Sequence, residues 1–332
     1  MLQFQNKAGK DPASVFDEVK ELDELNPILS NLEMRAGWNK KEPSLWKEPR
    51  DNFRAMHWQW EVAQKGLSIA GGMISTELTD RRNLFLVNPK GDHYATLRTL
   101  VCAYQMIMPG ERARSHRHSP HALRLALDVG KNVYTVVDGE RVDMAPNDVV
   151  LTPGGSWHGH ANDGTEDAYW IDFLDVPLVH LLEPMFLEHW PAGFQEPTTE
   201  NQTKSLVCAW KDISRQLDQQ LQAEKGKSSV SVVLDAPMVP TVEMLMTTIL
   251  AGKKTDRTRS TNNQIIAVVS GSGSTEVGGQ VFNWKRGDVM AIPCWAPVRH
   301  SAHEQATLFN VSDARAQKLL GYFRSEVLGN QD

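Results

Sequence analysis

Three histidines are spaced in a way that suits a metal centre. One residue separates His116 from His118, and His158 follows forty residues after His118. Side chains two apart on a β-strand share a face, so His116 and His118 can aim at one point, and His158 can complete a triangle from a neighbouring strand. Neutral imidazoles suit Fe, Zn, Cu or Ni rather than Mg or Ca. Three protein ligands leave coordination positions for substrate or water, which is typical of catalytic metal sites.

The segments that must position these histidines form two runs of short β-strands. From about Leu84, apolar segments alternate with turns rich in Gly, Pro, Asn and Asp, as in a barrel or sandwich. A second run begins near Val230 and can be laid on the first at a constant shift of about 140 residues. The chain is therefore predicted to be an internal repeat. Matching positions include Gly139 with Gly279, Asp148 with Asp288, Pro153 with Pro293, and His160 with His300.

The second repeat lacks the histidines of the first. At the same shift, the positions of His116, His118 and His158 are taken by Asp256, Thr258 and Val298. We therefore expect the second barrel to be structural, with a role in packing, in oligomerisation or in walling off the first site.

Helical periodicity appears outside the two β-rich runs. Helices are predicted from Ser14 to about Leu32, with Ser14 as N-cap and a break at Pro27, from about Ser205 to Ala223, and from about Asp313 to Leu328. The Trp-rich segment around Trp38, Trp46, Trp58 and Trp60 is interpreted as packing material. The predicted divisions are a helical segment at 1–80, a barrel with the metal site at 81–185, a linker and helix at 186–229, and a barrel without metal plus a helix at 230–332.

The composition is that of an ordinary globular protein. The formal net charge of −6 and a pI near 6.0 give no basic field for nucleic acid or an anionic membrane, so neither is an expected partner. The three cysteines are odd in number and widely spaced, as expected of thiols in a reducing compartment. No leader-like or membrane-spanning apolar run is recognised, and a cytoplasmic location is expected.

Two motifs around the histidines resemble those of the cupin family. Gly110 followed by His116 and His118 is similar to its first motif, and the order Asn147-Asp148, Pro153, Gly155, His158, Asn162 is similar to its second. Many cupins carry a Glu ligand four or five residues after the second His, where this chain has Ala122 and Leu123. The resemblance thus implies an all-β dominated bicupin, with two jelly-roll barrels and a three-His site without a carboxylate.

The first barrel also resembles the gentisate 1,2-dioxygenase family, which includes salicylate and 1-hydroxy-2-naphthoate dioxygenases. The matching stretches begin at Pro109-Gly110-Glu111, His116-Arg117-His118, Tyr134-Thr135-Val136, Trp157-His158-Gly159-His160 and Trp170-Ile171-Asp172. The resemblance implies an Fe(II) enzyme of aromatic catabolism and a homotetramer. Such an enzyme inserts O₂ between the carboxyl-bearing and hydroxyl-bearing carbons of gentisate or of a related salicylate, 5-substituted salicylates included.

Further site residues are expected around the metal. Arg124 lies six residues after His118, the same parity on an extended strand, so its guanidinium can fork onto a substrate carboxylate. His160 should face the same cavity as His158. The resemblance implies that His160 touches substrate or oxygen, that Arg81 or Arg82 supplies a second guanidinium, that Gln105 lines the pocket, and that Asp172 accompanies the distal ring hydroxyl of gentisate. The remaining histidines are interpreted as structural or exposed: His57, His93, His121, His180, His189 and His303.

Other functions stay open on the sequence. Salicylate or 1-hydroxy-2-naphthoate is an alternative substrate, and the small residues Gly154-Gly155-Ser156 suggest room for a larger ring. A Zn-dependent cupin isomerase normally needs the Glu that Ala122 or Leu123 replaces. A non-catalytic metal-binding cupin is the third alternative.

Overall fold

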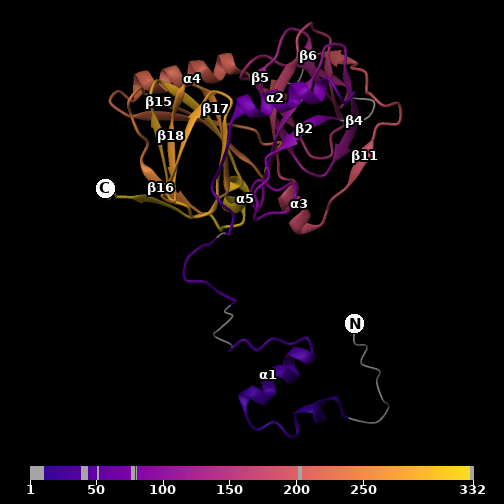
Figure 1. The fold of residues 1–332 in the computed structure, drawn as a ribbon, viewed down its shortest axis with the longest axis vertical. Coiled ribbons are helices and arrows are strands. Elements are labelled where there is room, and N and C mark those ends of the chain that lie inside the picture. The colour runs from indigo at the N-terminus through magenta and orange to yellow at the C-terminus, as the bar shows by residue number, and fades with distance from the viewer. Residues whose placement is uncertain are drawn as a thin grey trace. The chain divides into compact units, whose positions relative to one another are not determined.

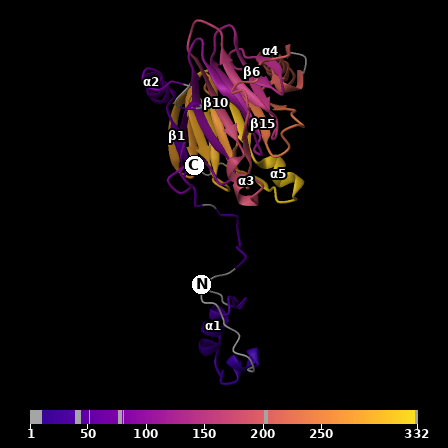
Figure 2. The same cartoon turned by 90° about the vertical axis from the view of Figure 1, so that its right-hand side faces the viewer.

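The structure, a computed structural model, describes residues 11–38, 44–50, 52–75, 79, 81–200 and 204–329. The chain divides into two compact units, Met1–Pro49 and Arg50–Asp332. Two β-barrels make up most of the second unit and lie side by side in it (Figures 1 and 2). The sequence expectation of an all-β dominated bicupin is thereby confirmed.

Helical structure in the first unit is shorter than the sequence suggested. The 3-10 helix η1 spans Pro12–Phe16 and is capped by Asp11, so Ser14 lies inside it rather than at an N-cap. Helix α1 spans Leu22–Asn31 and continues through Pro27 instead of breaking there. Because α1 buries no residue, the carbonyl that loses a partner at Pro27 can turn to solvent.

Two six-stranded sheets form the first barrel. Its strands are β2 (Arg82–Phe85), β3 (Val101–Ile107), β4 (Arg112–His118), β5 (Ala122–Asp128), β6 (Val133–Val137), β7 (Glu140–Asp143), β8 (Val149–Thr152), β9 (His158–Asn162), β10 (Ala168–Leu174), β11 (Leu187–His189), β12 (Thr199–Glu200) and β13 (Val207–Cys208). One sheet has the order β13-β8-β5-β10-β3-β2 and the other the order β11-β4-β9-β6-β7-β12. Helix α3 (Val176–Leu182) directly follows β10.

The second barrel repeats this plan with a six-stranded and a five-stranded sheet. Its strands are β1 (Met56–Trp58), β14 (Ser229–Leu234), β15 (Glu243–Ile249), β16 (Arg257–Ser260), β17 (Gln264–Ser270), β18 (Ser272–Val277), β19 (Gln280–Lys285), β20 (Val289–Ile292), β21 (Val298–Ala302), β22 (Ala306–Ser312) and β23 (Ser325–Leu328). The sheet orders are β1-β20-β17-β22-β15-β14 and β19-β18-β21-β16-β23.

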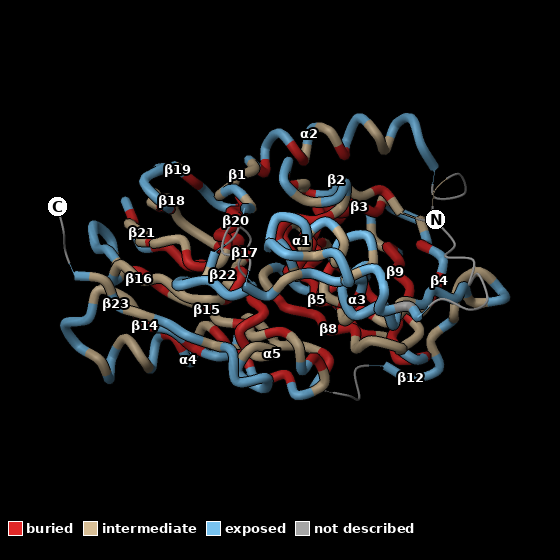
Figure 3. The backbone as a smooth tube through the Cα atoms, turned by 90° about the horizontal axis from the view of Figure 1, so that it is seen from below, coloured by how far each residue is buried: buried red, intermediate tan, exposed pale blue. Residues whose placement is uncertain are grey.

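The barrels share one apolar core where they meet. Strands β3, β5 and β10 are buried along nearly their whole length, because the outer face of their sheet is covered as well as its inner face (Figure 3). Phe173 of β10 meets Phe309 of β22 edge to face, with ring centroids 5.5 Å apart. The hydroxyl of Tyr104 on β3 donates to the carbonyl of Gly287 in the second barrel over 2.7 Å. The two repeats are therefore joined by a continuous hydrophobic interface.

Each barrel also pairs with a short strand whose following helix packs on the other barrel. Strand β1 pairs with β20 of the second barrel, yet helix α2 (Trp60–Gly71), which follows it, packs on β2 and β3 of the first. Strand β13 pairs with β8 of the first barrel, and helix α4 (Trp210–Ala223) packs on β14 and β15 of the second. The Trp60 backbone N–H donates to Asp288 over 2.8 Å, and the Trp210 N–H donates to Asp148 over 2.7 Å. The internal repeat thus includes these strand–helix pairs.

The strand register corrects the predicted alignment of the two repeats at one place. His116 pairs with His158 in the first barrel, and Thr258 pairs with Val298 in the second. The second barrel therefore has Thr258 and Ser260, rather than Asp256 and Thr258, in the places of His116 and His118. The shift is 142 residues up to β17, 140 from β18 to β21 and 138 at β22, because the connections from β5 to β6 and from β9 to β10 are longer than those from β17 to β18 and from β21 to β22. The second barrel still lacks the three histidines.

The chain segments outside the barrels differ from the predicted helices. Helix α5 is short, Ala314–Leu319, and β23 follows it and pairs with β16, where a helix to Leu328 was expected. Helix α4 begins at Trp210, after the short 3-10 helix η2 (Lys204–Leu206) and β13. Within the expected linker, β11 and β12 pair with β4 and β7 of the first barrel. No helix among the described residues is long and apolar enough to cross a membrane.

One buried histidine of the second barrel is expected to make stability depend on pH. His300 Nδ1 lies 2.8 Å from Thr275 Oγ1, and burial lowers the pKa of His300 to about 4. The unfolded chain takes up a proton near pH 6.5 and the folded chain does not, so this histidine costs stability as the pH falls from about 6.5 to about 4. As the pH falls through this window, the free energy of unfolding of the wild type should therefore decrease by up to about 1.4 kcal/mol per pH unit more than that of His300→Asn. Urea unfolding of both proteins at several pH values measures the difference, and parallel curves would contradict it.

Candidate metal centre and active site

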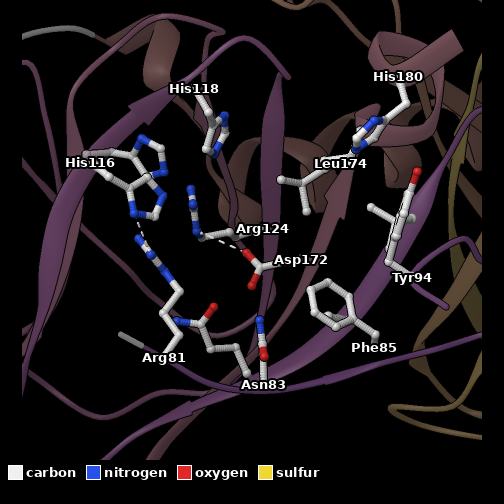
Figure 4. A pocket seen from close by; sticks show the side chains of 15 residues that line it. Arg81, Asn83, Phe85, Tyr94, His116, His118, Arg124, Asp172, Leu174 and His180 are labelled. Atoms are coloured by element: carbon white, nitrogen blue, oxygen red, sulfur yellow. Dashed lines mark hydrogen bonds and ion pairs between the residues drawn. The ribbon is translucent and has the colours of Figure 1, made fainter. Parts of the chain in front are cut away.

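The three predicted ligands come together inside the first barrel. His116 and His118 lie on β4 and His158 on β9, and one nitrogen of each ring lies within 4.8 Å of the other two. The ring centroid of His158 is 4.5 Å from that of His116 and 4.8 Å from that of His118. Figure 4 shows the rings of His116 and His118 on one wall of the cavity. Among the described residues, this group consists of the three histidines alone.

Backbone carbonyls orient two of the three rings. His118 Nδ1 lies 2.9 Å from the Pro120 carbonyl, and His158 Nδ1 lies 3.1 Å from the Ser156 carbonyl. A carbonyl only accepts, so both Nδ1 atoms donate and both Nε2 atoms keep a lone pair for a metal. His116 differs, because its Nδ1 accepts a hydrogen bond from Arg81 Nη1 over 2.7 Å.

All three imidazoles are held neutral. Burial, and then the charge of Arg81, lowers the pKa of His116 to about 2. Burial lowers the pKa of His118 to about 4, although the hydrogen bond to Pro120 opposes this shift. Burial also holds the pKa of His158 well below its ordinary value. Neutral imidazole is the form that binds a metal, so the site does not lose ligands to protonation near neutral pH.

A β-bulge in β4 sets the register position of His116 opposite β9. Ala113 pairs with His160 and His116 pairs with His158, so two residues of β4 lie opposite the single residue Gly159. The extra residue is Arg114 or Ser115, and Ser115 is fully buried, with its Oγ accepting from the Gln195 backbone N–H over 2.9 Å. A Cβ on Gly159 would lie 2.4 Å from that oxygen, so only glycine fits opposite the bulge.

The turn before His158 is bound to the chain after His118. The Gly155 N–H donates to the His118 carbonyl over 2.8 Å, and a Cβ on Gly154 would lie 2.2 Å from the carbonyl oxygen of Ser119. These small residues do not line the cavity, where room for a larger ring was expected of them. They allow the two ligand-bearing segments to approach closely.

Gly154→Ala is therefore expected to disturb the metal centre without touching a ligand. The new methyl group meets backbone on a tightly bound turn, which should cost about 1–3 kcal/mol of stability and weaken metal binding. Thermal unfolding and metal content of the purified protein check this. Gly72→Ala is the matched control, since the nearest described atom to its Cβ is the Ile69 carbonyl oxygen at an ordinary 3.6 Å. Equal metal content and melting temperature in the two variants would contradict the expectation.

An ion pair stands opposite the histidines in a cavity of about 320 Å³. Arg124 Nε on β5 lies 3.1 Å from Asp172 Oδ1 on β10, and both residues are buried. Arg124 Nη1 donates to Thr152 Oγ1 over 2.6 Å, and Trp170 Nε1 donates to Asp172 Oδ2 over 3.2 Å. Burial lowers the pKa of Arg124 and raises the pKa of Asp172, and the attraction between their charges opposes both shifts. Figure 4 shows the pair facing the metal ligands across the cavity.

Strand parity separates Arg81 from Arg82. Arg81, Asn83 and Phe85 share one face and line the cavity (Figure 4). Arg82 does not line it; its buried guanidinium is bound to Glu111 instead. Arg81 is therefore the second guanidinium near the metal ligands.

The remaining expected site residues take different positions. Gln105 on β3 lines the cavity. His160 does not: it lies behind His158, with ring centroids 6.2 Å apart and its Nδ1 3.0 Å from Thr135 Oγ1. Its Nε2 is buried and has no hydrogen-bond partner among the described residues. Burial holds the pKa of His160 well below its ordinary value, so this nitrogen belongs to a neutral ring.

Four polar or aromatic lining residues were not expected from the sequence. Asn83, Phe85, Tyr94 and His180 also line the cavity. Asn83 and Phe85 follow Arg81 at strand spacing and could have been found from it. Tyr94 and His180 come from a loop and from α3, far from any motif, and no local pattern marks them.

The residues of this site fit a metal ion. Two lone pairs, on His118 and His158, are oriented for a metal by backbone hydrogen bonds, whereas the Nδ1 lone pair of His116 accepts from Arg81, so His116 becomes the third ligand once that hydrogen bond is released. An all-nitrogen set of three neutral imidazoles suits Fe, Zn, Cu or Ni. Together, the paired jelly-roll barrels and this three-His site define a bicupin metalloprotein.

Comparisons with known proteins agree with that class and narrow it. Residues 103–176 match the Cupin domain family. The chain is 31% identical to gentisate 1,2 dioxygenase 1 of Aquipseudomonas alcaligenes, over 92% of this chain and 96% of that one. It is 30% identical to 5-aminosalicylate 1,2-dioxygenase of Comamonas sp, over 92% and 90%. The chain belongs to this family of 1,2-dioxygenases.

A solved structure has the same fold over nearly the whole length. The salicylate 1,2-dioxygenase from Pseudoaminobacter salicylatoxidans, crystallised with gentisate, superimposes with a TM-score of 0.86. The match covers 94% of this chain and 95% of that one at 24% identity.

Proposed function

We propose that this enzyme is an Fe(II)-dependent dioxygenase that cleaves the ring of gentisate or a related 5-substituted salicylate. The bond between the carboxyl-bearing and hydroxyl-bearing carbons breaks, and both atoms of O₂ enter the ring-opened product. The observation that carries the proposal is one cavity with three neutral imidazoles on one wall and Arg124 with Asp172 on the other. Relatives named for gentisate and 5-aminosalicylate support it.

His116, His118 and His158 would hold the iron, and Fe(II) bound there supplies the redox chemistry that O₂ activation needs and a chelation point for the substrate's carboxylate and hydroxyl. The chain's own residues do the rest. Arg81 and Arg124 offset the charge of a bound carboxylate, and Asp172 fixes the guanidinium of Arg124 in the cavity wall. The unpartnered Nε2 of His160 offers a hydrogen-bonding group behind the metal ligands.

The closely packed wall keeps the aromatic ring in one orientation. Ala103, Val101 and Leu174 line the cavity beside the ion pair and exclude water from the ring's faces. Holding both reactants in one geometry contributes to rate, because translational and rotational freedom is lost on binding rather than in the transition state.

The experiment is O₂ consumption by the protein reconstituted with Fe(II), with gentisate, 5-aminosalicylate, salicylate and 1-hydroxy-2-naphthoate offered one at a time. Ultraviolet absorbance follows the ring-opened product. We expect uptake with at least one 5-substituted ring. Uptake with salicylate or 1-hydroxy-2-naphthoate alone would reassign the substrate, and silence on all four would favour a binding function.

Metal analysis of the same preparation separates this proposal from a zinc isomerase. Turnover should follow iron content, and a chelator should remove it until Fe(II) is restored. Turnover that followed zinc content instead would contradict the proposed cofactor.

We also propose that the enzyme works as a homotetramer in the cytoplasm. None of the three cysteines forms a disulfide, as a reducing compartment favours, and the fold matches a family member over nearly its whole length. Light scattering after size exclusion measures the oligomeric state, and a stable monomer would contradict it.

A further inference from the structure

The cavity has a polar half and an apolar half, which strand register arranges in rows. Asn83 of β2 lies beside Gln105 of β3, and the next row contains Phe85, Ala103, Asp172 and Arg124. One row further along lie Val101 of β3 and Leu174 of β10, which are also register partners. The lining therefore becomes apolar in the direction of α3, away from the row of Gln105 (Figure 4).

Two polar side chains end this apolar half. Tyr94 comes from the loop before β3, and His180 comes from α3. Their rings lie together, with centroids 5.1 Å apart and an interplanar angle of 35°. Figure 4 shows them beyond Leu174 and Phe85, on the side of the cavity away from Arg81.

The Tyr94–His180 pair is also the boundary to a second hollow. A cavity of about 370 Å³ adjoins the first and shares Tyr94 and His180 with it. Its other lining residues include Lys90, Asp92 and Arg98. The ring pair thus forms a wall between the metal cavity and a charged outer hollow.

Asp172 is held in the wall opposite the histidines by two neighbours. Arg124 Nε lies 3.1 Å from Oδ1 as an ion pair, and the Trp170 indole donates to Oδ2. Beyond the row of Asp172, in the apolar half, the polar side chains of the lining are those of Tyr94 and His180.

We propose that Tyr94 and His180 recognise a polar substituent on the ring carbon para to the chelating hydroxyl. The inference rests on the proposed function, since it takes the carboxylate and hydroxyl of the substrate to face the histidines. The para carbon then lies at the far side of the ring, in the apolar half that the pair closes. A phenol and an imidazole both donate and accept hydrogen bonds, so a hydroxyl or amino group is matched and a bare C–H is not.

The test compares substrates that differ only at this carbon. Tyr94→Phe and His180→Phe are measured with gentisate, 5-aminosalicylate and salicylate, both as kcat/KM and as anaerobic dissociation constants from tryptophan fluorescence. Each variant should lower the ratio of kcat/KM for gentisate to that for salicylate by about three- to tenfold, the effect of one net hydrogen bond. The dissociation constants should change in the same ratio.

Tyr134→Phe is the matched control. Its hydroxyl donates to Asp163 over 3.0 Å and does not line the cavity, so the same loss of one oxygen should leave the substrate ratio unchanged. A ratio within about twofold of wild type in both Tyr94→Phe and His180→Phe would overturn the inference and leave the pair a packing contact.

Failure of the proposed function is distinguishable from failure of the inference. Wild-type protein that neither binds nor turns over any 2-hydroxybenzoate removes both. Wild-type protein that acts on these rings, with variants that lose all three substrates equally, removes only the assignment of Tyr94 and His180.

Discussion

His158→Ala is expected to abolish O₂ uptake and to lower metal affinity by at least about a hundredfold. His158 is almost fully buried, its pKa is held low by burial, and its Nδ1 donates to the Ser156 carbonyl, so its neutral ring keeps an oriented Nε2 lone pair for a metal. Alanine leaves two imidazoles, too few to hold a catalytic metal with open positions. Iron content and O₂ consumption are measured on the purified variant.

His189→Ala serves as the control for this prediction. The ring of His189 lies 6.3 Å from that of His116 but is not part of the ligand group, so its loss should leave the iron in place. Metal-free wild type gives the reference melting temperature for the His158 variant, which separates lost ligation from lost folding. A His158→Ala protein that kept both iron and full O₂ uptake would refute the metal centre.

Arg124→Met is expected to destabilise the protein by about 3–5 kcal/mol, because it leaves the buried carboxyl of Asp172 without its counter-charge. The same change removes a guanidinium from the cavity wall, so the KM for a ring carboxylate should rise. Urea unfolding and steady-state kinetics measure the two effects.

The double variant Arg124→Met with Asp172→Asn tells these effects apart. Neutralising both partners removes the uncompensated charge, so much of the lost stability should return. The raised KM should remain, because no guanidinium is restored. A double variant as unstable as the single one would show that packing around Thr152, rather than charge, sets the cost.

The metal centre could be predicted because its signals are local. A spacing of two residues on a strand fixes the shared face of His116 and His118, and the turn-punctuated segments predicted two barrels at a nearly constant shift. The absence of the three histidines from the second barrel was predicted too. The strand register, however, places Thr258 and Ser260, rather than Asp256 and Thr258, at the positions that correspond to His116 and His118.

Which arginine supplies the second guanidinium could be decided only from the structure, because the sequence does not show which face of the strand points into the cavity. Arg81 and Arg82 are adjacent and chemically identical, and only the packing of β2 on β3 decides that Arg81 faces the cavity and Arg82 faces Glu111. The same holds for the end of the chain: its apolar spacing resembled a helix, yet pairing with β16 made residues Ser325–Leu328 a strand.

The sequence by itself determined the fold class, the three imidazoles and the cation at Arg124, because period-two alternation and motif spacing act over a few residues. Tertiary structure alone decided which segments close the cavity: Tyr94 and His180 lie 86 residues apart and meet only because α3 packs beside the loop before β3. It also decided that β1 and β13 are held by the opposite barrel. Such contacts depend on surfaces formed by the whole chain, which no local pattern encodes.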